Sequence, residues 1–579
     1  MTALAEGRTL CEAGFGLGVD RVFVDFALDV VPGGVLHLHG IRVDCAFVGP
    51  SPPKGGCLLR AFVRAWFLHF TECVGSVRIG MSAPNSTSRT ASRDVVIAIR
   101  SAFTLGGSLV ATWAIAMVVR IFLPRHLGPE LFGTYNFAES FTATAFVFLQ
   151  MGMDIYIRKE VSVRPEHASD FFGGIVVIRL AVSVLLFGLM AAVLSWMGRP
   201  AEVQRVVFVF GIAQFLFVLT ENFAALLQAS RQVVGLAVVN VVHKILWGAG
   251  VAAAILLDGS LEAMAGAFLF SMLFRAIALL PLLRRHLHLR FTINARSAFR
   301  VIVISLPFYL NAVAYTIYGK LDVSLMSGLA NDREVGWYGC ASNFAGLALL
   351  ITPLIGSVLM PLLSRAAADS EARLNALLRR AIEAVLGIAI PVSLMMGVGA
   401  DTWIGVLFGP EFANSVSSLR ILAPVFVITY IATLLATSLI LLERAWTVTV
   451  VSLTGLGLNL VLNLLVVPYA LRRFGEGGAG IGAASVMIVT ELSVAVAFLV
   501  LLGGRSFDRR SAIVVLKSVG AVMVVIGIDW LMSGLGAARL LLDALAYGAL
   551  VLATGAVRPK EVAELVRTSL ARKAAGADA

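Results

Sequence analysis

The sequence LGPELFGTYNFAESF, at Leu127–Phe141, occurs a second time in looser form as LANDREVGWYGCASNF at Leu329–Phe344. The pattern Gly-x-Tyr-x-x-Ala begins at Gly133 in the first copy and at Gly336 in the second. In each copy a polar turn ends one long apolar run, and the Gly-x-Tyr begins the next. Repetition of this kind is typical of membrane transporters built from duplicated lobes, so the pair predicts two related lobes.

The composition indicates a membrane protein. Of the 579 residues, 59% are hydrophobic and 14% are charged, and the mean hydropathy is +0.90. Soluble domains contain about 25% charged residues. The net charge of +11 agrees with Lys and Arg on the cytoplasmic loops of a membrane protein. Because the sequence has no arginine-rich block with interleaved aromatic residues, we predict no nucleic acid among its partners.

Apolar runs of membrane-spanning length follow one another from residue 95 to residue 557. A helix needs about 20 mostly apolar residues to cross a bilayer. By this criterion we predict an all-α polytopic membrane protein, with about 14 transmembrane helices in two pseudo-symmetric six-helix lobes plus two C-terminal helices. The predicted spans are 97–122, 131–154, 171–196, 204–227, 232–257, 262–283, 300–327, 335–360, 380–402, 416–441, 445–469, 479–503, 511–532 and 538–556.

The distribution of basic residues gives the orientation of these spans. When the N-terminus is placed in the cytoplasm, the inside loops contain roughly twice as many Lys and Arg as the outside loops. This bias indicates that both termini are cytoplasmic. The predicted segments are a leader at 81–94, an N-terminal lobe at 95–283, a basic linker at 284–299, a C-terminal lobe at 300–503, two additional helices at 504–557 and a tail at 558–579.

Residues 1–80 differ from the rest of the chain. They hold four of the five cysteines, and they lack both a helical stripe and the order of a signal peptide. The sequence MSAPNSTSRTASRD, from Met81, reads as a short basic leader before a hydrophobic helix. We therefore expect residues 1–80 to be an over-extended reading frame or a disordered segment; a peptide from them in the native protein would disprove the first. The cysteines lack paired C-x-x-C spacing, so no metal site is predicted.

Polar side chains recur at helical spacing inside the predicted spans. Polar groups that face lipid are costly, so such stripes are expected to face other helices or a water-filled cavity. We interpret Asn459 and Asn463 as hydrogen-bond partners between helices, Arg120 as reaching the headgroups, and Lys320 as lying off the Asp322 face. The predicted lining of a cavity between the lobes is Tyr135, Glu139, Gln214, Glu221, Asn240, His243, Asn311, Tyr315, Tyr318 and Asp322.

Three cations, Arg179, Lys244 and Arg275, lie within predicted spans. Two interpretations of them stay open. They neutralise Glu139 or Glu221, or they bind an anionic substrate.

The motifs of familiar enzymes are missing from the sequence. It contains no G-x-x-x-x-G-K-[ST], no H-E-x-x-H and no G-x-S-x-G, so we predict no ATPase, no other enzyme activity and no cofactor. Uphill transport would then depend on an ion gradient or on removal of the product. Proton uptake by Glu221 or Asp322 is our hypothesis for such coupling.

Between Ser88 and Val557 the chain resembles the polysaccharide transporters, the O-antigen-type flippases of the superfamily that includes multidrug and toxic-compound extruders and lipid II flippases. Each motif is loose, and their order along the chain carries the resemblance. The motifs are Arg125-His-Leu-Gly-Pro-Glu-x-Phe-Gly-x-Tyr135, Gly152-x-Asp154-x-x-x-Arg158-x-Glu160, Leu321-Asp322-x-x-Leu325-x-x-Gly328 with Val335-Gly-x-Tyr338, Pro361-x-x-Ser364-Arg365, Leu407-Phe-Gly-x-x-Phe412, Asn459-x-x-x-Asn463 with Pro468, and Gly477-Gly-Ala-Gly-x-Gly482.

The resemblance implies two lobes around a central cavity that opens alternately to each side of a bacterial inner membrane. It implies an undecaprenyl-pyrophosphate-linked oligosaccharide as cargo, moved to the periplasmic leaflet for lipopolysaccharide O-antigen or exopolysaccharide, with a polysaccharide polymerase and a chain-length regulator as partners. In related flippases a cationic cavity receives the pyrophosphate. By helix position, Arg179, Lys244 and Arg275 are the candidates for that role.

Two alternatives are weighed against the flippase. A cation-coupled multidrug antiporter of the same superfamily would need an acidic cavity, and the predicted spans carry both signs of charge, so this alternative stays open. A membrane polysaccharide polymerase or ligase would need a large periplasmic loop with catalytic residues. No predicted outside loop is long enough for one.

Overall fold

The chain divides into two units, Met1–Arg89 and Thr90–Ala579. In the first unit, strands β1 (Val19–Val31) and β2 (Val35–Phe47) pair antiparallel. These strands were not predicted, and the hypothesis of a later start stays a prediction.

The computed structural model describes residues 19–31, 35–47, 86–150, 157, 168–230, 232–286, 295–503, 509–532, 536 and 538–554.

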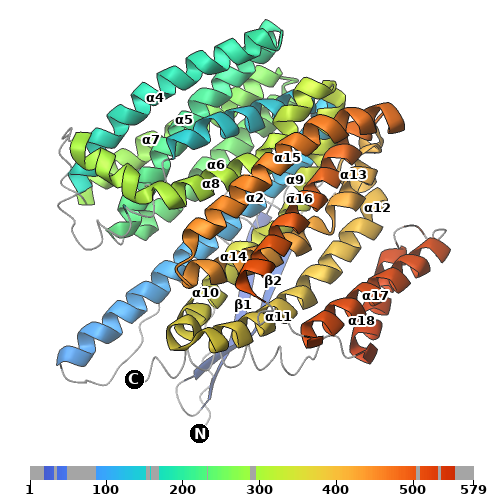
Figure 1. Ribbon diagram of the computed structural model, residues 1–579. Coiled ribbons are helices and arrows are strands. Elements are labelled where there is room, and N and C mark those ends of the chain that lie inside the picture. The colour runs from blue at the N-terminus through green and yellow to red at the C-terminus, as the bar shows by residue number, and fades with distance from the viewer. Residues whose placement is uncertain are drawn as a thin grey trace. The chain divides into compact units, whose positions relative to one another are not determined.

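The N-terminal lobe consists of long helices, seen in blue to green in Figure 1. Its first helix runs through two predicted spans with one break, at Gly128, where φ is 71° and ψ is 173°. Glycine tolerates this positive φ, and Pro129 follows it without an N–H to donate, so the chain bends there. The helices are α2 (Ser86–Phe146), α4 (Ala168–Trp196), α5 (Ala201–Ala229), α6 (Val233–Leu256) and α7 (Leu261–His286).

The C-terminal lobe repeats this plan. A 3₁₀ turn follows the first repeat at Val147–Leu149, and another follows the second repeat at Ala348–Ile351, so the duplication extends beyond the Gly-x-Tyr pattern. The helices are α8 (Ala295–Leu329), α9 (Asp332–Leu347), α10 (Thr352–Asp369), α11 (Glu371–Val398), α12 (Ala400–Leu407), α13 (Ser415–Leu422), α14 (Val425–Leu441), α15 (Ala445–Phe474) and α16 (Gly478–Leu502).

Two residues of the second repeat cap helix ends in this lobe. Asn331 accepts a hydrogen bond from the N–H of Glu334 at 2.9 Å, which begins α9. The carboxylate of Glu334 is buried and accepts from the N–H groups of Gly477 (2.6 Å) and Ala479 (3.1 Å) at the start of α16. An acidic group is favourable there because a helix N-terminus carries unpaired donors and a partial positive charge. Through Glu334, the second repeat thereby binds the N-terminus of α16.

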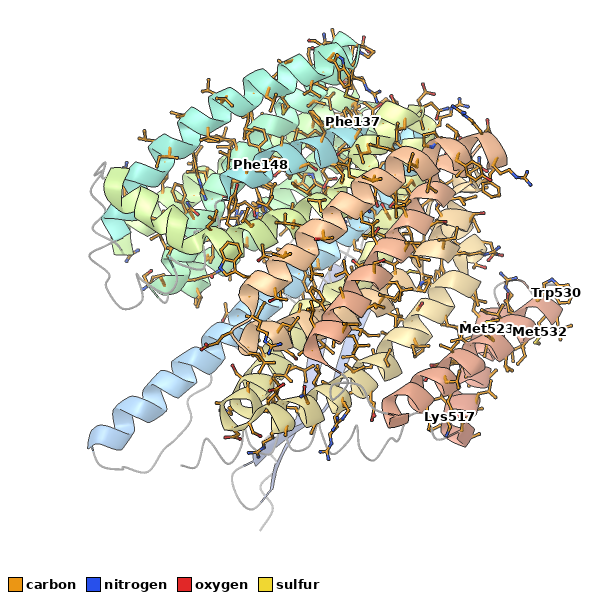
Figure 2. The ribbon with its side chains drawn as sticks, viewed as in Figure 1. Phe137, Phe148, Lys517, Met523, Trp530 and Met532 are labelled. Atoms are coloured by element: carbon orange, nitrogen blue, oxygen red, sulfur yellow. The ribbon has the colours of Figure 1, made fainter. Side chains whose placement is uncertain are left out.

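The last two helices, α17 (Arg509–Leu531) and α18 (Arg539–Thr554), pack on each other and against α11. Figure 1 shows them at the edge of the helical unit. Figure 2 labels Met523 and Trp530 on α17; their side chains are 64% and 77% exposed. Large apolar side chains so exposed are expected where lipid takes the place of water.

The predicted all-α polytopic membrane fold is confirmed. Within the described part of the chain, nine helices are long and apolar enough to cross a membrane. Each of the predicted spans overlaps a helix, but some boundaries differ. For example, α11 begins at Glu371, with Ser370 as its N-cap, rather than near residue 380. Hydropathy identifies the apolar segment that crosses the lipid. It does not identify the polar helical turns that continue the helix beyond that segment.

Candidate functional site: a charged cavity beneath the crossing of the repeats

The two copies of the repeat meet each other directly. A Cβ atom added to Gly133 would lie 1.8 Å from the carbonyl oxygen of Asp332, and one added to Gly336 would lie 1.9 Å from that of Pro129. Asp332 precedes Gly336 by the same four residues by which Pro129 precedes Gly133. The contact is therefore reciprocal, as across a two-fold axis. Only glycine leaves room for two backbones at this distance.

Polar contacts between the lobes surround these glycines. Arg199, in the connection between α4 and α5, forms an ion pair with Asp332 (Nη1–Oδ1 2.9 Å) and also donates to the carbonyl oxygen of Ser327. Glu130 and Arg333 form a second ion pair (Oε2–Nε 3.4 Å) and lie 203 residues apart, as Gly133 and Gly336 do. Together these contacts hold the lobes against each other at this end of the bundle.

A cavity of about 210 Å³ lies among helices of the N-terminal lobe, and Asn343 of the C-terminal lobe completes its lining. Its lining combines aromatic rings with charged and amide side chains. Arg120 and Glu139 belong to α2 on either side of its break, Lys244 to α6, and Asn343 to α9. The full lining is Ala116, Val119, Arg120, Leu123, Phe132, Tyr135, Glu139, Phe210, Gln214, Phe217, Lys244, Trp247, Phe268, Met272 and Asn343.

The charges at this cavity converge on one carboxylate. Oε1 of Glu139 is 3.9 Å from Nη2 of Arg120 and 3.9 Å from Nζ of Lys320, which α8 supplies from the C-terminal lobe. Lys244 also interacts electrostatically with Glu139, and its Nζ lies 4.5 Å from the centre of the Trp247 ring. Three cations and one carboxylate give this cluster, which we call the Glu139 cluster, a net charge of +2.

Four of the residues predicted to form the site line this cavity: Tyr135, Glu139, Gln214 and Lys244. Phe137, labelled in Figure 2, lies between Tyr135 and Glu139 in the sequence of α2, but it packs in the hydrophobic core and does not line the cavity. A helix turns by about 100° per residue, so residues two apart point to different sides.

The other two predicted cations have partners inside the N-terminal lobe. Arg179 is 1% exposed and donates from Nη1 to the carbonyl oxygen of Val218 (2.9 Å) and from Nη2 to that of Gln150 (3.0 Å). Arg275 forms an ion pair with Glu221 at 2.8 Å. Of the three predicted cations, Lys244 alone lines the cavity. The pair of Arg275 and Glu221 agrees with the interpretation in which a cation neutralises Glu221, whereas Arg179 bonds backbone carbonyl groups.

The remaining predicted residues lie apart from the cavity lining or outside the described side chains. His243 is buried on α6, and Asn240 is partly buried one turn before it. The predictions for Asn311, Tyr315 and Tyr318 fall on side chains outside those that the structure describes.

Asp322 forms a separate polar cluster in the C-terminal lobe. It accepts hydrogen bonds from Tyr338 Oη (3.0 Å) and Asn463 Nδ2 (2.9 Å), and Asn463 also donates to Asn459 Oδ1 (3.0 Å). The interpretation of Asn463 as a partner between helices is confirmed, because Asn463 on α15 bonds Asp322 on α8. The bond between Asn463 and Asn459 lies within α15. Tyr338 of the second repeat is thus hydrogen-bonded to α8 and, through Asp322, linked to α15.

Arg120 and Lys320 belong to the Glu139 cluster, although the sequence reasoning did not assign them to the site. Arg120 ends an apolar run, which favoured a position at the headgroups. However, α2 continues from it to the break at Gly128, so Arg120 lies within the helix and reaches Glu139. Lys320 lies two residues from Asp322 and therefore points to a different side of α8. Asp322 bonds within its own lobe, and Lys320 reaches across to the other.

Comparison with known proteins agrees with this fold. Residues 98–367 match the family described as polysaccharide biosynthesis protein. The probable low-salt glycan biosynthesis flippase Agl15 of Haloferax volcanii is 23% identical over 192 residues, which cover 33% of this chain and 39% of that protein. The match therefore spans less than half the length of this curated relative.

Two solved structures have a similar arrangement of helices. One is the lipid II flippase MurJ in an inward closed conformation, with a TM-score of 0.56 and 15% identity, covering 76% of this chain and 98% of that one. The other is an inward-facing multidrug resistance MATE family transporter of the MOP superfamily, with a TM-score of 0.55 and 14% identity, covering 69% of this chain and 99% of that one. The matched proteins are named as flippases and transporters, not as enzymes. The resemblance to the polysaccharide transporter family is thus confirmed, and the helical unit has the fold that MurJ and the MATE transporters share.

Proposed function

We propose that the protein is a flippase that moves an undecaprenyl-pyrophosphate-linked oligosaccharide from the cytoplasmic to the periplasmic leaflet by alternating access. The observation that carries this proposal is the net positive charge of the Glu139 cluster, which lies between the lobes. A pyrophosphate that links a lipid to a sugar carries two negative charges at neutral pH. It would match the +2 of the cluster. Arg and Lys bind phosphate oxygens strongly where water is scarce.

The size of the cavity supports a moving pair of lobes. Pockets for drug-sized ligands measure about 300–1,000 Å³, and this cavity of about 210 Å³ is smaller than an oligosaccharide needs. The lobes must therefore separate to admit the sugar, while the lipid tail stays in the bilayer. In the predicted orientation, the crossing of Gly133 and Gly336 lies on the periplasmic side. We propose that it closes that side until the cargo is bound.

The wider setting follows from the proposed cargo. The flippase would act in a bacterial inner membrane with both termini in the cytoplasm, and it would supply O-antigen or exopolysaccharide assembly by a polymerase and a chain-length regulator. The similarity in fold to a lipid II flippase and the sequence similarity to a glycan biosynthesis flippase support this class of cargo. The positive cavity disfavours the cation antiporter, whose cargo would be repelled by the Glu139 cluster.

Replacing Lys244 by Gln is expected to lower flipping by about tenfold or more, because a charge-assisted hydrogen bond to phosphate contributes about 1.5–3 kcal/mol and 1.4 kcal/mol corresponds to tenfold. The measurement is the flipping of a fluorescent undecaprenyl-pyrophosphate oligosaccharide in proteoliposomes. Lys517→Gln is the matched control. That residue, labelled in Figure 2, lies on α17 and donates to the carbonyl oxygen of Thr554.

Each outcome of this experiment has a distinct meaning. Flipping that falls in Lys244→Gln and persists in Lys517→Gln supports the cationic cavity. Equal flipping by both variants keeps a flippase and removes Lys244 from its site. A wild-type protein that exports a cationic dye and flips no lipid contradicts the proposal in favour of the antiporter.

A further inference from the structure

We infer that Glu139 is an internal counter-ion, which offsets one of the three positive charges of the Glu139 cluster in the empty protein and is displaced from these cations by the diphosphate of the cargo. The inference rests on the proposed function and deepens it, because it assigns a role to the carboxylate in a cavity built for an anion.

Glu139 lies where the charges of both lobes meet. The same oxygen, Oε1, is 3.9 Å from Arg120 of the N-terminal lobe and 3.9 Å from Lys320 of the C-terminal lobe. Without this carboxylate, Arg120, Lys320 and Lys244 would face one another as like charges in a partly dry cavity, where repulsion is stronger than in water. The empty site therefore needs an anion, and the chain supplies one.

The distances indicate that this anion is loosely held. Hydrogen bonds between charged nitrogen and oxygen atoms are about 2.7–2.9 Å long, so 3.9 Å is an ion pair without a direct hydrogen bond. Two other ion pairs of the same protein have hydrogen-bonding distances: Arg275 lies 2.8 Å from Glu221, and Arg199 lies 2.9 Å from Asp332. The donors of Arg120 and Lys320 are not bonded to Glu139 and can turn to a ligand.

The charge balance explains why a carboxylate would be kept in an anion site. With a diphosphate bound, the net charge of +2 in the Glu139 cluster becomes zero. If residue 139 were neutral, the loaded cavity would retain one surplus positive charge, and the cargo would bind more tightly. A flippase must also release its cargo on the far side, so tighter binding slows the cycle. Glu139 thus sets the affinity at a value that permits release.

The first measurement is the binding of inorganic pyrophosphate to the purified full-length protein by titration calorimetry. Glu139→Gln is expected to lower the Kd at least tenfold, and Glu139→Asp, which keeps the charge, is expected to stay within about threefold of wild type. Glu139→Asn, also uncharged, must tighten binding as well and serves if the Gln variant does not fold. The matched control is Glu262→Gln, whose carboxylate pairs with Arg205 at the exposed end of α7 and should leave the Kd unchanged.

The second measurement separates affinity from turnover. In proteoliposomes, Glu139→Gln is expected to lower both the KM for the lipid-linked oligosaccharide and the maximal rate of flipping. A merely structural role would reduce the amount of active protein without lowering KM.

The outcomes distinguish this inference from the proposed function. Wild-type binding of pyrophosphate with equal or weaker binding by Glu139→Gln overturns the counter-ion role and leaves the flippase standing. No binding of pyrophosphate by the wild type overturns both. Binding of a cationic dye that is lost in Glu139→Gln makes Glu139 a cation ligand and likewise overturns the inference.

Discussion

Gly336→Ala is expected to shift the crossing between the repeats toward its open form and to reduce flipping about tenfold or more. The added methyl group would lie 1.9 Å from the carbonyl oxygen of Pro129 and 2.7 Å from its carbonyl carbon. These are backbone atoms, so no side-chain rotation relieves the clash, and the two lobes must move apart. Overpacking in a well-packed contact costs about 1–3 kcal/mol, and 1.4 kcal/mol is a tenfold change in the ratio of closed to open forms.

Accessibility from the periplasmic side measures this effect directly. A cysteine in place of Gln214, which lines the cavity, would be labelled by a membrane-impermeant maleimide faster in Gly336→Ala than in the wild-type background. Gly346→Ala is the matched control, because it lies on the same helix and an added Cβ there meets no atom within 4 Å. Unchanged labelling together with wild-type flipping in Gly336→Ala would contradict a role for this contact in gating.

Glu334→Ala is expected to lower the free energy of unfolding by about 3 kcal/mol. The substitution removes the acceptor of two buried N–H groups, those of Gly477 and Ala479, and each buried donor left without a partner costs about 1–3 kcal/mol. The loss also removes an acidic group from the N-terminus of α16. Unfolding in detergent, followed by heat or denaturant, gives the comparison.

The control for Glu334 is a carboxylate of similar size with an exposed partner. Glu262→Ala breaks the ion pair with Arg205, in which both side chains are largely exposed, and such pairs contribute about 0–1 kcal/mol. Equal stability of the Glu334→Ala and Glu262→Ala variants would show that the start of α16 does not depend on Glu334. The expected difference is large enough to separate these results.

The sequence predicted the elements of the fold because hydropathy and the repeat are local patterns. The lobes, the extra helix pair and the polar partners Asn459 and Asn463 all follow from helical spacing and the cost of polar groups in lipid. A polar turn was also expected between the first apolar run and the Gly-x-Tyr that begins the next. The structure adds that α2 runs through it as one bent helix.

The site was harder to predict because it depends on which side of a helix faces which neighbour. Arg179 and Lys244 have similar depth in their predicted spans, yet one bonds two backbone carbonyl groups and the other lines the cavity. Depth alone does not separate these positions. The partner of Lys320 was not predictable for the same reason, because Glu139 lies on a helix of the other lobe.

The ion pair of Glu130 and Arg333 has a consequence for the history of the chain. These residues occupy equivalent positions of the two repeats, as Asn136 and Gly339 do, and each pair meets close to the pseudo-two-fold axis. In a homodimer of one six-helix ancestor, a residue at such a position faces the same residue of the other copy. A charged residue there would meet a like charge, and a large side chain would meet an equally large one. Opposite charges, or a large residue opposite a glycine, require two separately mutable copies. Fusion of the lobes into one chain made this contact available to selection.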